Sequence, residues 1–362
     1  MSRNFERFDP SSTDAGLGPG GTLSRRTLLG GAFGLGTAFL LGACRNQSNQ
    51  VSADPSPTGD GSASPTTPAA FPVQLDHKFG STVVTATPER IACVGLTEHD
   101  AVLAVGMAPV AVTEWFGEFP SATWPWAQDE LGDAKPVVLS YADGIQIERV
   151  AEVAPDLILG TNAGLNKGTY KKLASIAPTL AQSGDYTDYF EPWKVQTTAI
   201  GKALGKDEEM QALIKGVDDT FAAARAEHPE FEGKNVFLLA PDFYDGQLFV
   251  YQEGLSTQFL LDLGLKIPEV VKEYATDPSS AYIPKEDLVD VLEVGDVVIW
   301  ATYDDGKKLL DDPIVKRLRS TRENRNLFTG LELTGAMNFT TVLSLPFVAE
   351  KLVPQLAEIL GG

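Results

Sequence analysis

From residue 71 onward, short runs of β-branched and aliphatic residues alternate with segments whose apolar residues recur every three or four positions. This alternation is typical of strands connected by helices and predicts mainly parallel sheets. A first set comprises strands at 91–95, 109–113, 136–139, 157–159 and 179–181, with helices at 98–105, 147–153 and 167–176. A second set comprises strands at 235–240, 248–251 and 297–300, with helices at 256–263, 285–292, near 313–318 and at 347–359. We therefore expect an α/β fold with two lobes.

One helical pattern between the two sets is much longer than the others. It begins at Asp207, which is a suitable N-cap residue, and ends before Pro229. Its apolar residues form one stripe at steps of three and four: Met210, Leu213, Ile214, Val217 and Phe221. A helix of about 21 residues is roughly 31 Å long, which is enough to cross both lobes and fix the angle between them. An ordinary amphipathic helix inside one lobe is the alternative.

A weak internal repeat supports two equivalent lobes. In each half a glutamate opens a short amphipathic helix, and an aspartate then leads into a buried strand. The pairs are Glu148 with Asp156 and Glu286 with Asp296. The two spacings differ, so the repeat is one of pattern rather than of register.

The N-terminal segment has the features of an export signal. Arg25 and Arg26 precede an apolar run that ends at Leu-Gly-Ala-Cys44, and this run is shorter than the ~20 residues needed to cross a bilayer. The paired arginines resemble a twin-arginine signal, and the final four residues resemble a lipobox in which Cys44 is lipidated after cleavage. We expect a signal peptide at 1–43 and a disordered tether at 44–72, with a lipid anchor on the extracytoplasmic face of a bacterial cell membrane. The alternative is an apolar helix with a chance cysteine.

Composition narrows the function further. The chain has 29 Lys and Arg against 49 Asp and Glu, a net charge of −20, which disfavours nucleic acids and anionic lipid headgroups as partners. Its two cysteines and three histidines are too few for a disulfide framework or a histidine-rich metal centre. Cys93 lies in an apolar strand pattern and is expected to be a buried, unpaired thiol. The motifs of α/β-hydrolases, P-loop NTPases and HExxH metalloproteases are absent from the sequence, so we expect no enzyme.

Four stretches of the chain are similar to iron–siderophore substrate-binding proteins: residues 88–115, 145–160, 201–205 and 343–347. The resemblance implies two Rossmann-like lobes joined by one rigid helix, with the ligand in the cleft between them. It also implies the function of a monomeric carrier that delivers a ferric siderophore to an ABC permease with its ATPase. Haem or cobalamin, which related proteins carry, is the alternative ligand. An exported hydrolase and a lipid-anchored adhesion or scaffold protein are the rival classes.

On this basis we expect an N-terminal lobe at 73–192, a linking helical segment at 193–230 and a C-terminal lobe at 231–362. Ligands of open α/β sheets bind beyond the carboxyl ends of the strands. Aromatic rings there give a bulky chelate a large contact area with few rotatable bonds to freeze. The predicted ligand contacts are Thr97, Glu98, Trp115, Phe116, Trp124, Trp126, Tyr141, Tyr186, Tyr189, Tyr244 and Tyr303. Packing of Trp124 and Trp126 inside a small core is the alternative.

The chelator of a ferric siderophore already surrounds the iron, so we expect no cofactor and no metal-ligating residue in the protein. The acidic chain favours a neutral or cationic chelate such as a ferric hydroxamate. A local basic pocket would reverse that preference, and the candidates for it are Lys167, Lys171 and Lys172. His99, at a helix start beside the expected cleft, is expected to be solvated.

The resemblance also assigns a role to Glu148 and Glu286. Each matches a position at which this family carries one glutamate per lobe, where the carboxylates pair with arginines of the two permease subunits. Alternatively, each glutamate only stabilises the N-terminus of its own helix, an effect of ~0.3–1 kcal/mol.

Overall fold

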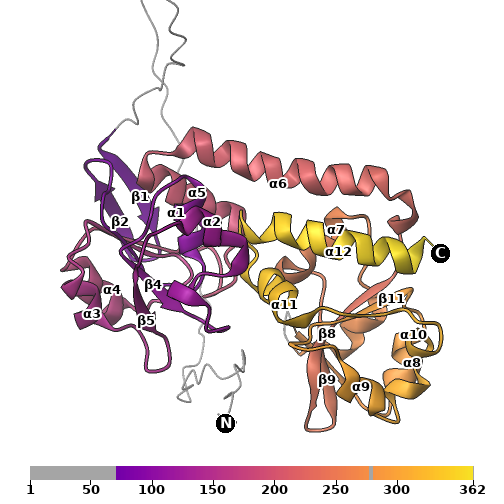
Figure 1. Cartoon of the computed structure of the whole chain (residues 1–362). Coiled ribbons are helices and arrows are strands. Elements are labelled where there is room, and N and C mark those ends of the chain that lie inside the picture. The colour runs from indigo at the N-terminus through magenta and orange to yellow at the C-terminus, as the bar shows by residue number, and fades with distance from the viewer. Residues whose placement is uncertain (1–70, 277–279, 362) are drawn as a thin grey trace, which may run out of the picture. The chain divides into compact units, whose positions relative to one another are not determined.

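The computed structural model describes residues 71–276 and 280–361. These residues form two five-stranded sheets with flanking helices and one separate two-stranded hairpin (Figure 1). The predicted signal peptide, the lipidated Cys44 and nearly all of the predicted tether lie outside the described residues. Within the described ranges, no helix combines the length and the apolar character that a membrane span requires.

The first sheet, which with its helices forms the first lobe, is parallel throughout and has the strand order β5-β4-β3-β6-β7. Its elements are β3 (Ile91–Cys93), α1 (Glu98–Ala104), β4 (Ala111–Glu114), α2 (Gln128–Leu131), β5 (Val137–Ser140), α3 (Ile147–Glu152), β6 (Leu157–Gly160), α4 (Lys167–Ala174) and β7 (Thr179–Ala181). Alternate residues of β3 enter two different hydrophobic clusters, because both faces of the sheet are covered. Cys93 is a free, buried thiol in β3, as predicted.

The second sheet, which with its helices forms the second lobe, is mixed and has the order β10-β9-β8-β11-β12. Its elements are β8 (Val236–Tyr244), β9 (Gln247–Tyr251), α7 (Gln258–Asp262), β10 (Ser280–Pro284), α8 (Leu288–Leu292), β11 (Val297–Trp300), α9 (Lys307–Asp311), α10 (Arg319–Arg322), β12 (Asn326–Phe328), α11 (Gly330–Phe339) and α12 (Ser344–Leu360). Asp245 and Gly246 have φ of 45° and 75° and form a two-residue hairpin turn, so β9 returns antiparallel to β8. The prediction of mainly parallel sheets is therefore confirmed for the first lobe only.

The sequence patterns left several elements unpredicted. These are the hairpin of β1 (Val73–His77) and β2 (Gly80–Val84), the strands β10 and β12, and the helices α2, α9, α10 and α11. Of the helix expected near 313–318, only a 3-10 helix at Val315–Arg317 is present. The helix expected at 285–292 begins only at Leu288, because 285–287 form the turn that follows β10, in which the Lys285 N–H donates to the Gly246 carbonyl. Short 3-10 helices complete the chain: η1 (Pro120–Ala122), η2 (Pro125–Ala127), η3 (Pro229–Phe231), η4 (Leu255–Thr257), η5 (Glu269–Tyr274) and η6 (Val315–Arg317).

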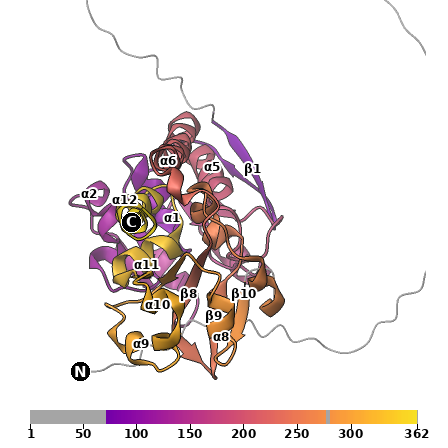
Figure 2. The ribbon, with the colours of Figure 1, turned by 90° about the vertical axis from the view of Figure 1, so that its right-hand side faces the viewer.

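The long helix α6 (Asp207–Glu227) has 21 residues and contributes to both lobes. Met210 belongs to a core cluster of the first lobe, Val217 and Phe221 belong to the core of the second, and Leu213 packs against both. Helix α5 (Trp193–Leu204) packs against α6 on the side of the first lobe (Figures 1 and 2). The predicted N-cap is wrong: Lys206 holds that position, and Asp207 is already in the first helical turn.

The internal repeat corresponds to equivalent contacts in the two lobes. The Asp156 carboxylate accepts hydrogen bonds from the backbone N–H groups of Glu89 and Arg90 at 2.8 and 2.9 Å. The Asp296 carboxylate accepts one from the N–H of Asn235 at 2.9 Å. Each aspartate directly precedes β6 or β11 and binds residues that lead into the parallel neighbour at the centre of the sheet, β3 or β8. It therefore helps to set the register of the paired strands, which explains why it recurs.

Candidate ligand-binding site

The predicted ligand contacts gather where parallel strands end. In the first lobe, Thr97 and Glu98 follow β3, Trp115 and Phe116 follow β4, Tyr141 follows β5, and Tyr186 and Tyr189 follow β7. In the second lobe, Tyr244 is the last residue of β8 and Tyr303 follows β11. Because parallel strands end at the same edge of a sheet, each lobe presents one edge rich in aromatic side chains.

Rings from both lobes meet in an aromatic cluster, which consists of Trp115, Phe116, Trp124, Trp126 and Phe339. Trp124 and Trp126 stack with their centroids 4.9 Å apart and their planes 15° from parallel. Phe339, the last residue of α11, lies 5.3 Å from Trp115 and 5.2 Å from Trp126 between ring centroids. The cluster therefore joins the strand ends of the first lobe to the second lobe.

Phe339 is a member of this cluster that sequence reasoning missed. Most residues of α11 are apolar or small and buried, so the pattern of the helix does not distinguish one face from another. The available signal is Gly335, which stands four residues before Phe339 and so on the same face. A glycine and an aromatic residue at that spacing indicate a helix face packed closely against a large group.

Three of the predicted contacts are buried: Thr97, Glu98 and Trp124 have exposed fractions of 6%, 1% and 1%. Trp124 packs against α11 at Gly335, where an added Cβ would lie 2.3 Å from the indole ring. Trp124 is therefore buried against the second lobe rather than inside the core of its own lobe, and Trp126 is only partly buried. In this structure these three residues lie inside the protein and support the predicted contacts that are exposed.

Glu98 is a buried acid that connects two loops. Its carboxylate accepts hydrogen bonds from the backbone N–H of Asn162 at 2.7 Å and of Thr97 at 3.2 Å, and from the Thr161 hydroxyl at 3.4 Å. Burial raises the pKa of Glu98, and these hydrogen bonds oppose the rise. A Cβ at Gly95 would lie 2.0 Å from the carboxylate, so glycine at this position gives the acid its space.

We expect Glu98→Gln to change how stability depends on pH. The folded protein holds the Glu98 proton above the ordinary pKa of 4.5, so its free energy of unfolding falls as pH rises from 4.5 to the folded pKa. The variant lacks this proton. The unfolding free energy of the wild type minus that of the variant should therefore be larger at pH 4 than at pH 7, by about 1.4 kcal/mol for each unit of raised pKa. Urea unfolding across this range measures the difference, and a constant difference would contradict the raised pKa.

Tyr141 and Tyr189 connect the loops after β5 and β7. Their hydroxyl groups hydrogen-bond to each other, and Tyr189 packs on Gly164, where a Cβ would lie 2.3 Å from the Tyr189 hydroxyl oxygen. Tyr189 has a φ of 69°, a left-handed conformation that costs a non-glycine residue about 1 kcal/mol or more. Burial, together with the hydrogen bond to Tyr141, raises the pKa of Tyr189. The phenol of Tyr189 is therefore neutral, and whichever hydroxyl accepts within the Tyr141–Tyr189 pair keeps its own proton for a chelate oxygen.

The other three tyrosines among the predicted ligand contacts are exposed. Tyr186 is 40% exposed, Tyr244 is 49% exposed and Tyr303 is 56% exposed. In the second lobe, the β8–β9 hairpin that carries Tyr244 is tied to α9 by an ion pair of 3.1 Å between Lys308 and Asp242. Helix α9 follows the loop of Tyr303, so the two tyrosines sit on connected segments.

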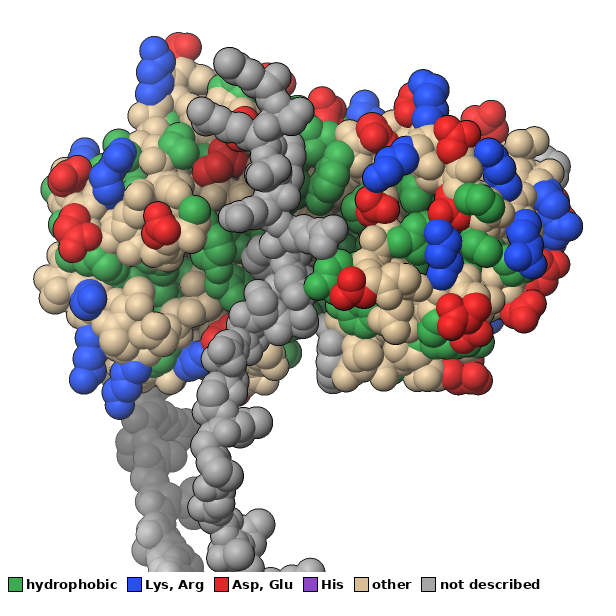
Figure 3. All heavy atoms as spheres, turned by 90° about the horizontal axis from the view of Figure 1, so that it is seen from below, with side chains coloured by type: hydrophobic (Ala, Val, Ile, Leu, Met, Phe, Trp, Pro, Cys, Tyr) green, Lys and Arg blue, Asp and Glu red, His purple; other side chains and the backbone are tan. Residues whose placement is uncertain are grey.

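Charged side chains of both signs lie near these strand ends: Glu114 is the last residue of β4, Asp304 follows Tyr303, and Lys308 pairs with Asp242, two residues before Tyr244. Lys167, Lys171 and Lys172 are exposed along α4. On the face shown in Figure 3, hydrophobic side chains gather toward the middle, and most Lys and Arg side chains lie toward the outer parts. Among the residues that the structure describes, no group of three or more His, Cys, Asp and Glu side chains could hold a metal ion. The predicted contacts whose side chains are at least partly exposed offer aromatic rings and hydroxyl groups.

The prediction for His99 is wrong. The side chain is fully buried, and its ring meets the edge of Phe339 with 5.9 Å between the centroids. The polar residues around His99 predict a solvated side chain from the sequence alone. In the structure, the second lobe covers the start of α1.

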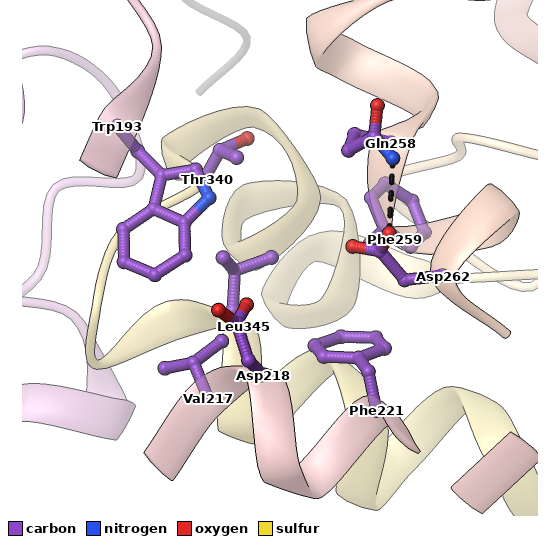
Figure 4. A pocket seen from close by; sticks show the side chains of 9 residues that line it. All are labelled: Trp193, Val217, Asp218, Phe221, Gln258, Phe259, Asp262, Thr340 and Leu345. Carbon is purple, nitrogen blue, oxygen red and sulfur yellow. Dashed lines mark hydrogen bonds between the residues drawn. The ribbon is translucent and has the colours of Figure 1, made fainter. Parts of the chain in front are cut away.

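A small pocket lies elsewhere, beside α6 (Figure 4). Its lining comes from α6, α7, the connection between α11 and α12, and Trp193, and Gln258 in this lining donates a hydrogen bond to Asp262 at 2.9 Å. None of the predicted ligand contacts lines it, so this pocket and the predicted site are different places.

Comparison with known proteins gives consistent matches. The sequence matches the periplasmic binding protein family over residues 91–329. A periplasmic solute binding protein from Mycobacterium smegmatis is 46% identical, and its crystal structure matches 80% of this chain and 99% of its own with a TM-score of 0.75. PiaA of Streptococcus pneumoniae, solved in complex with ferrichrome, is 26% identical over 80% of this chain and 98% of its own, with a TM-score of 0.66. The Fe(3+)-citrate-binding protein YfmC of Bacillus subtilis is 25% identical over 274 residues, which cover 69% of this chain and 76% of that protein.

Proposed function

The chain belongs to the periplasmic binding protein family, and from this premise we propose that it captures a ferric siderophore, of the hydroxamate type, for an ABC permease. The observation that carries the proposal is the aromatic cluster, in which Phe339 of the second lobe lies against Trp115 and Trp126 of the first. Phe339 itself is buried, so a ligand held there would lie on the partly exposed rings of Trp115 and Trp126, beside the second lobe. Such large aromatic surfaces suit a bulky and partly apolar chelate. The iron is cargo that the chelator coordinates, and the protein binds the chelator.

Charge favours a hydroxamate over an anionic chelate. The chain carries a net charge of −20, which repels a strongly negative ligand. Tyr141 and Tyr189 supply a pair of hydrogen-bonded hydroxyl groups at the strand ends. PiaA, at 26% identity, was solved with ferrichrome, which is a ferric hydroxamate. YfmC, whose name states ferric citrate, is a relative of similar identity, so citrate is the competitor that a test must include.

We further propose that Cys44 is lipidated after twin-arginine export, which places a monomeric carrier on the extracytoplasmic face of the cell membrane. The Leu-Gly-Ala-Cys44 sequence and the paired arginines before it support this arrangement. A tether of about 30 residues would let the carrier reach a permease in the same membrane.

Mass spectrometry of the protein isolated from iron-starved cells tests the identity of the ligand. We expect an iron-bearing chelate with hydroxamate groups, released on denaturation at one per chain. Ferric citrate would contradict the hydroxamate assignment while keeping the carrier role. Release of haem or cobalamin would contradict the siderophore assignment and show that the protein carries the alternative ligand.

Glu148 and Glu286 are proposed to dock the carrier to its permease. Both side chains are exposed; Glu148 lies in the first turn of α3, and Glu286 lies in the turn before α8. The helices α3 and α8 precede β6 and β11, the strands that pair with the central strand of each sheet, so the two acids occupy equivalent places. With both lobes fixed on α6, the carboxylates can meet two arginines at a set separation.

We expect the double variant Glu148→Ala/Glu286→Ala to lower cellular iron–siderophore uptake about fivefold or more while leaving ligand affinity unchanged, because the docking surface alone is lost. Glu152→Ala/Glu293→Ala is the matched control, since these exposed acids lie at the other ends of α3 and α8. Uptake is measured with a radiolabelled ferric chelate at equal expression. Equal uptake by both double variants would contradict the docking role and leave Glu148 and Glu286 only the alternative role of stabilising the starts of their helices.

A further inference from the structure

Asp100 joins the two lobes inside the protein. It lies in the first turn of α1 and is fully buried. One of its carboxylate oxygens, Oδ2, accepts a hydrogen bond from the Trp126 indole Nε1 at 2.9 Å and another from the Thr341 hydroxyl. Trp126 belongs to the aromatic cluster of the first lobe, whereas Thr341 lies between α11 and α12 of the second lobe, 241 residues further along the chain.

Thr341 also binds Ser344, the first residue of helix α12. Its hydroxyl accepts a hydrogen bond from the Ser344 N–H at 3.0 Å, and its own N–H donates to the Ser344 hydroxyl at 2.8 Å. The Thr341 hydroxyl thus donates a hydrogen bond to Asp100 while accepting one from the Ser344 N–H. A carboxylate at this place is further stabilised by the dipole of the 17-residue α12.

The surroundings of Asp100 contain few other charges. Its second oxygen, Oδ1, has no hydrogen-bond partner and lies 3.6 Å from Nε2 of His99, whose ring nitrogens also have none. Burial raises the pKa of Asp100 and lowers that of His99. The other ionisable groups that interact with this region are Glu98 on α1 and the Cys93 thiol on β3. The described contacts from the other packed elements are Trp126, Phe339 and Thr341, which carry no charge.

We infer that Asp100 is a positioning residue: its carboxylate holds the Trp126 indole in place and fastens the first lobe to the start of α12, so that the ligand meets a preformed aromatic cluster. The inference rests on the proposed function for its effect on ligand release, but the contact itself does not depend on any ligand. Without the Thr341 hydroxyl, the Asp100 carboxylate would keep only its hydrogen bond from the Trp126 indole. The two lobes would also lose the hydrogen bond between Thr341 and Asp100, and hydrogen bonds to charged groups are stronger than those between neutral groups.

The test compares Thr341→Val, Thr341→Ser and Asp100→Asn in the full chain. The first readout is the indole N–H signal of Trp126 in ¹H–¹⁵N spectra without ligand, assigned through Trp126→Phe. We expect Thr341→Val to shift this signal and to speed its hydrogen exchange, and Thr341→Ser to restore both. In the wild type the signal should move with pH as Asp100 titrates, and Asp100→Asn should abolish that movement.

The second readout is the rate at which a ferric hydroxamate dissociates. We expect about tenfold faster release from Thr341→Val and wild-type release from Thr341→Ser. Thr334→Val is the matched control: this buried hydroxyl of α11 donates to the Thr302 carbonyl at 2.7 Å inside the second lobe, so its loss should lower stability without changing either readout.

The outcomes separate two failures. If Thr341→Val behaves like Thr334→Val, with lower stability but an unchanged Trp126 signal and release rate, Asp100 makes an ordinary buried hydrogen bond and the inference is wrong. If the wild type binds no ferric chelate, the proposed function fails, and the ligand-free spectra still decide whether Asp100 positions Trp126.

Discussion

Replacing Trp115 with alanine is expected to weaken binding of the ferric chelate by about thirtyfold, or ~2 kcal/mol. The indole is partly exposed at the end of β4, and it packs edge-on against Phe116 with 4.9 Å between centroids and against Phe339 at 5.3 Å. Its removal takes away contact area on the first lobe and one neighbour of the ring that the second lobe contributes. Equilibrium titration of the variant with a ferric hydroxamate measures the loss.

Trp193→Ala is the matched control, because Trp193 lines the separate pocket beside α6 and its loss should leave affinity within threefold. Tyr141→Ala and Tyr303→Ala test the other strand ends of the two lobes. If Trp115, Tyr141 and Tyr303 could each be replaced with a change below threefold, which is under ~0.7 kcal/mol, the site would be in the wrong place.

Gly335→Ala is expected to destabilise the protein by about 1–3 kcal/mol. The new Cβ would lie 2.3 Å from the Trp124 ring, and Trp124 has no room to retreat because it is buried and stacked on Trp126. Helix α11 would have to move away from the first lobe. The measurement is denaturant unfolding, followed by titration to see whether affinity falls with the displaced cluster.

Gly216→Ala in α6 is the control for helix propensity. A Cβ at Gly216 meets nothing within 4 Å, so this variant should gain about 0.5–1 kcal/mol of stability. The two substitutions are chemically identical and should have opposite signs. A stabilised Gly335→Ala variant would show that α11 does not need its close approach to Trp124.

Local patterns predicted the elements whose signal lies in their own residues. The apolar stripe of α6 and the apolar run of β11 both appear at their predicted positions, because each is set by burial of consecutive or regularly spaced residues. The antiparallel return of β9 was missed although Asp245-Gly246 is a strong hairpin signal. The strands β10 and β12 form because they pair with β9 and β11. A short run of sequence contains little information about such a pairing partner, so these strands were not predicted.

The site shows the same division. Aromatic residues after strand ends are visible in the sequence, and they do lie at those ends. The burial of His99 and Asp100 is not visible, because the groups that cover them, Phe339 and Thr341, arrive from the far end of the chain. The burial of Trp124 is not visible in the sequence for the same reason. The helix that buries it, α11, is distant in sequence and has no amphipathic pattern.

Titration of the purified full chain, followed by its tryptophan fluorescence, tests the central claim most directly. The ligands are a ferric hydroxamate, a ferric catecholate, ferric citrate, haem and cobalamin. Because Trp115, Trp124 and Trp126 lie in one cluster, the account predicts strong, saturable quenching by the ferric hydroxamate that ends at one equivalent, with weaker responses to the other ligands. A flat response to all three ferric chelates would contradict the account.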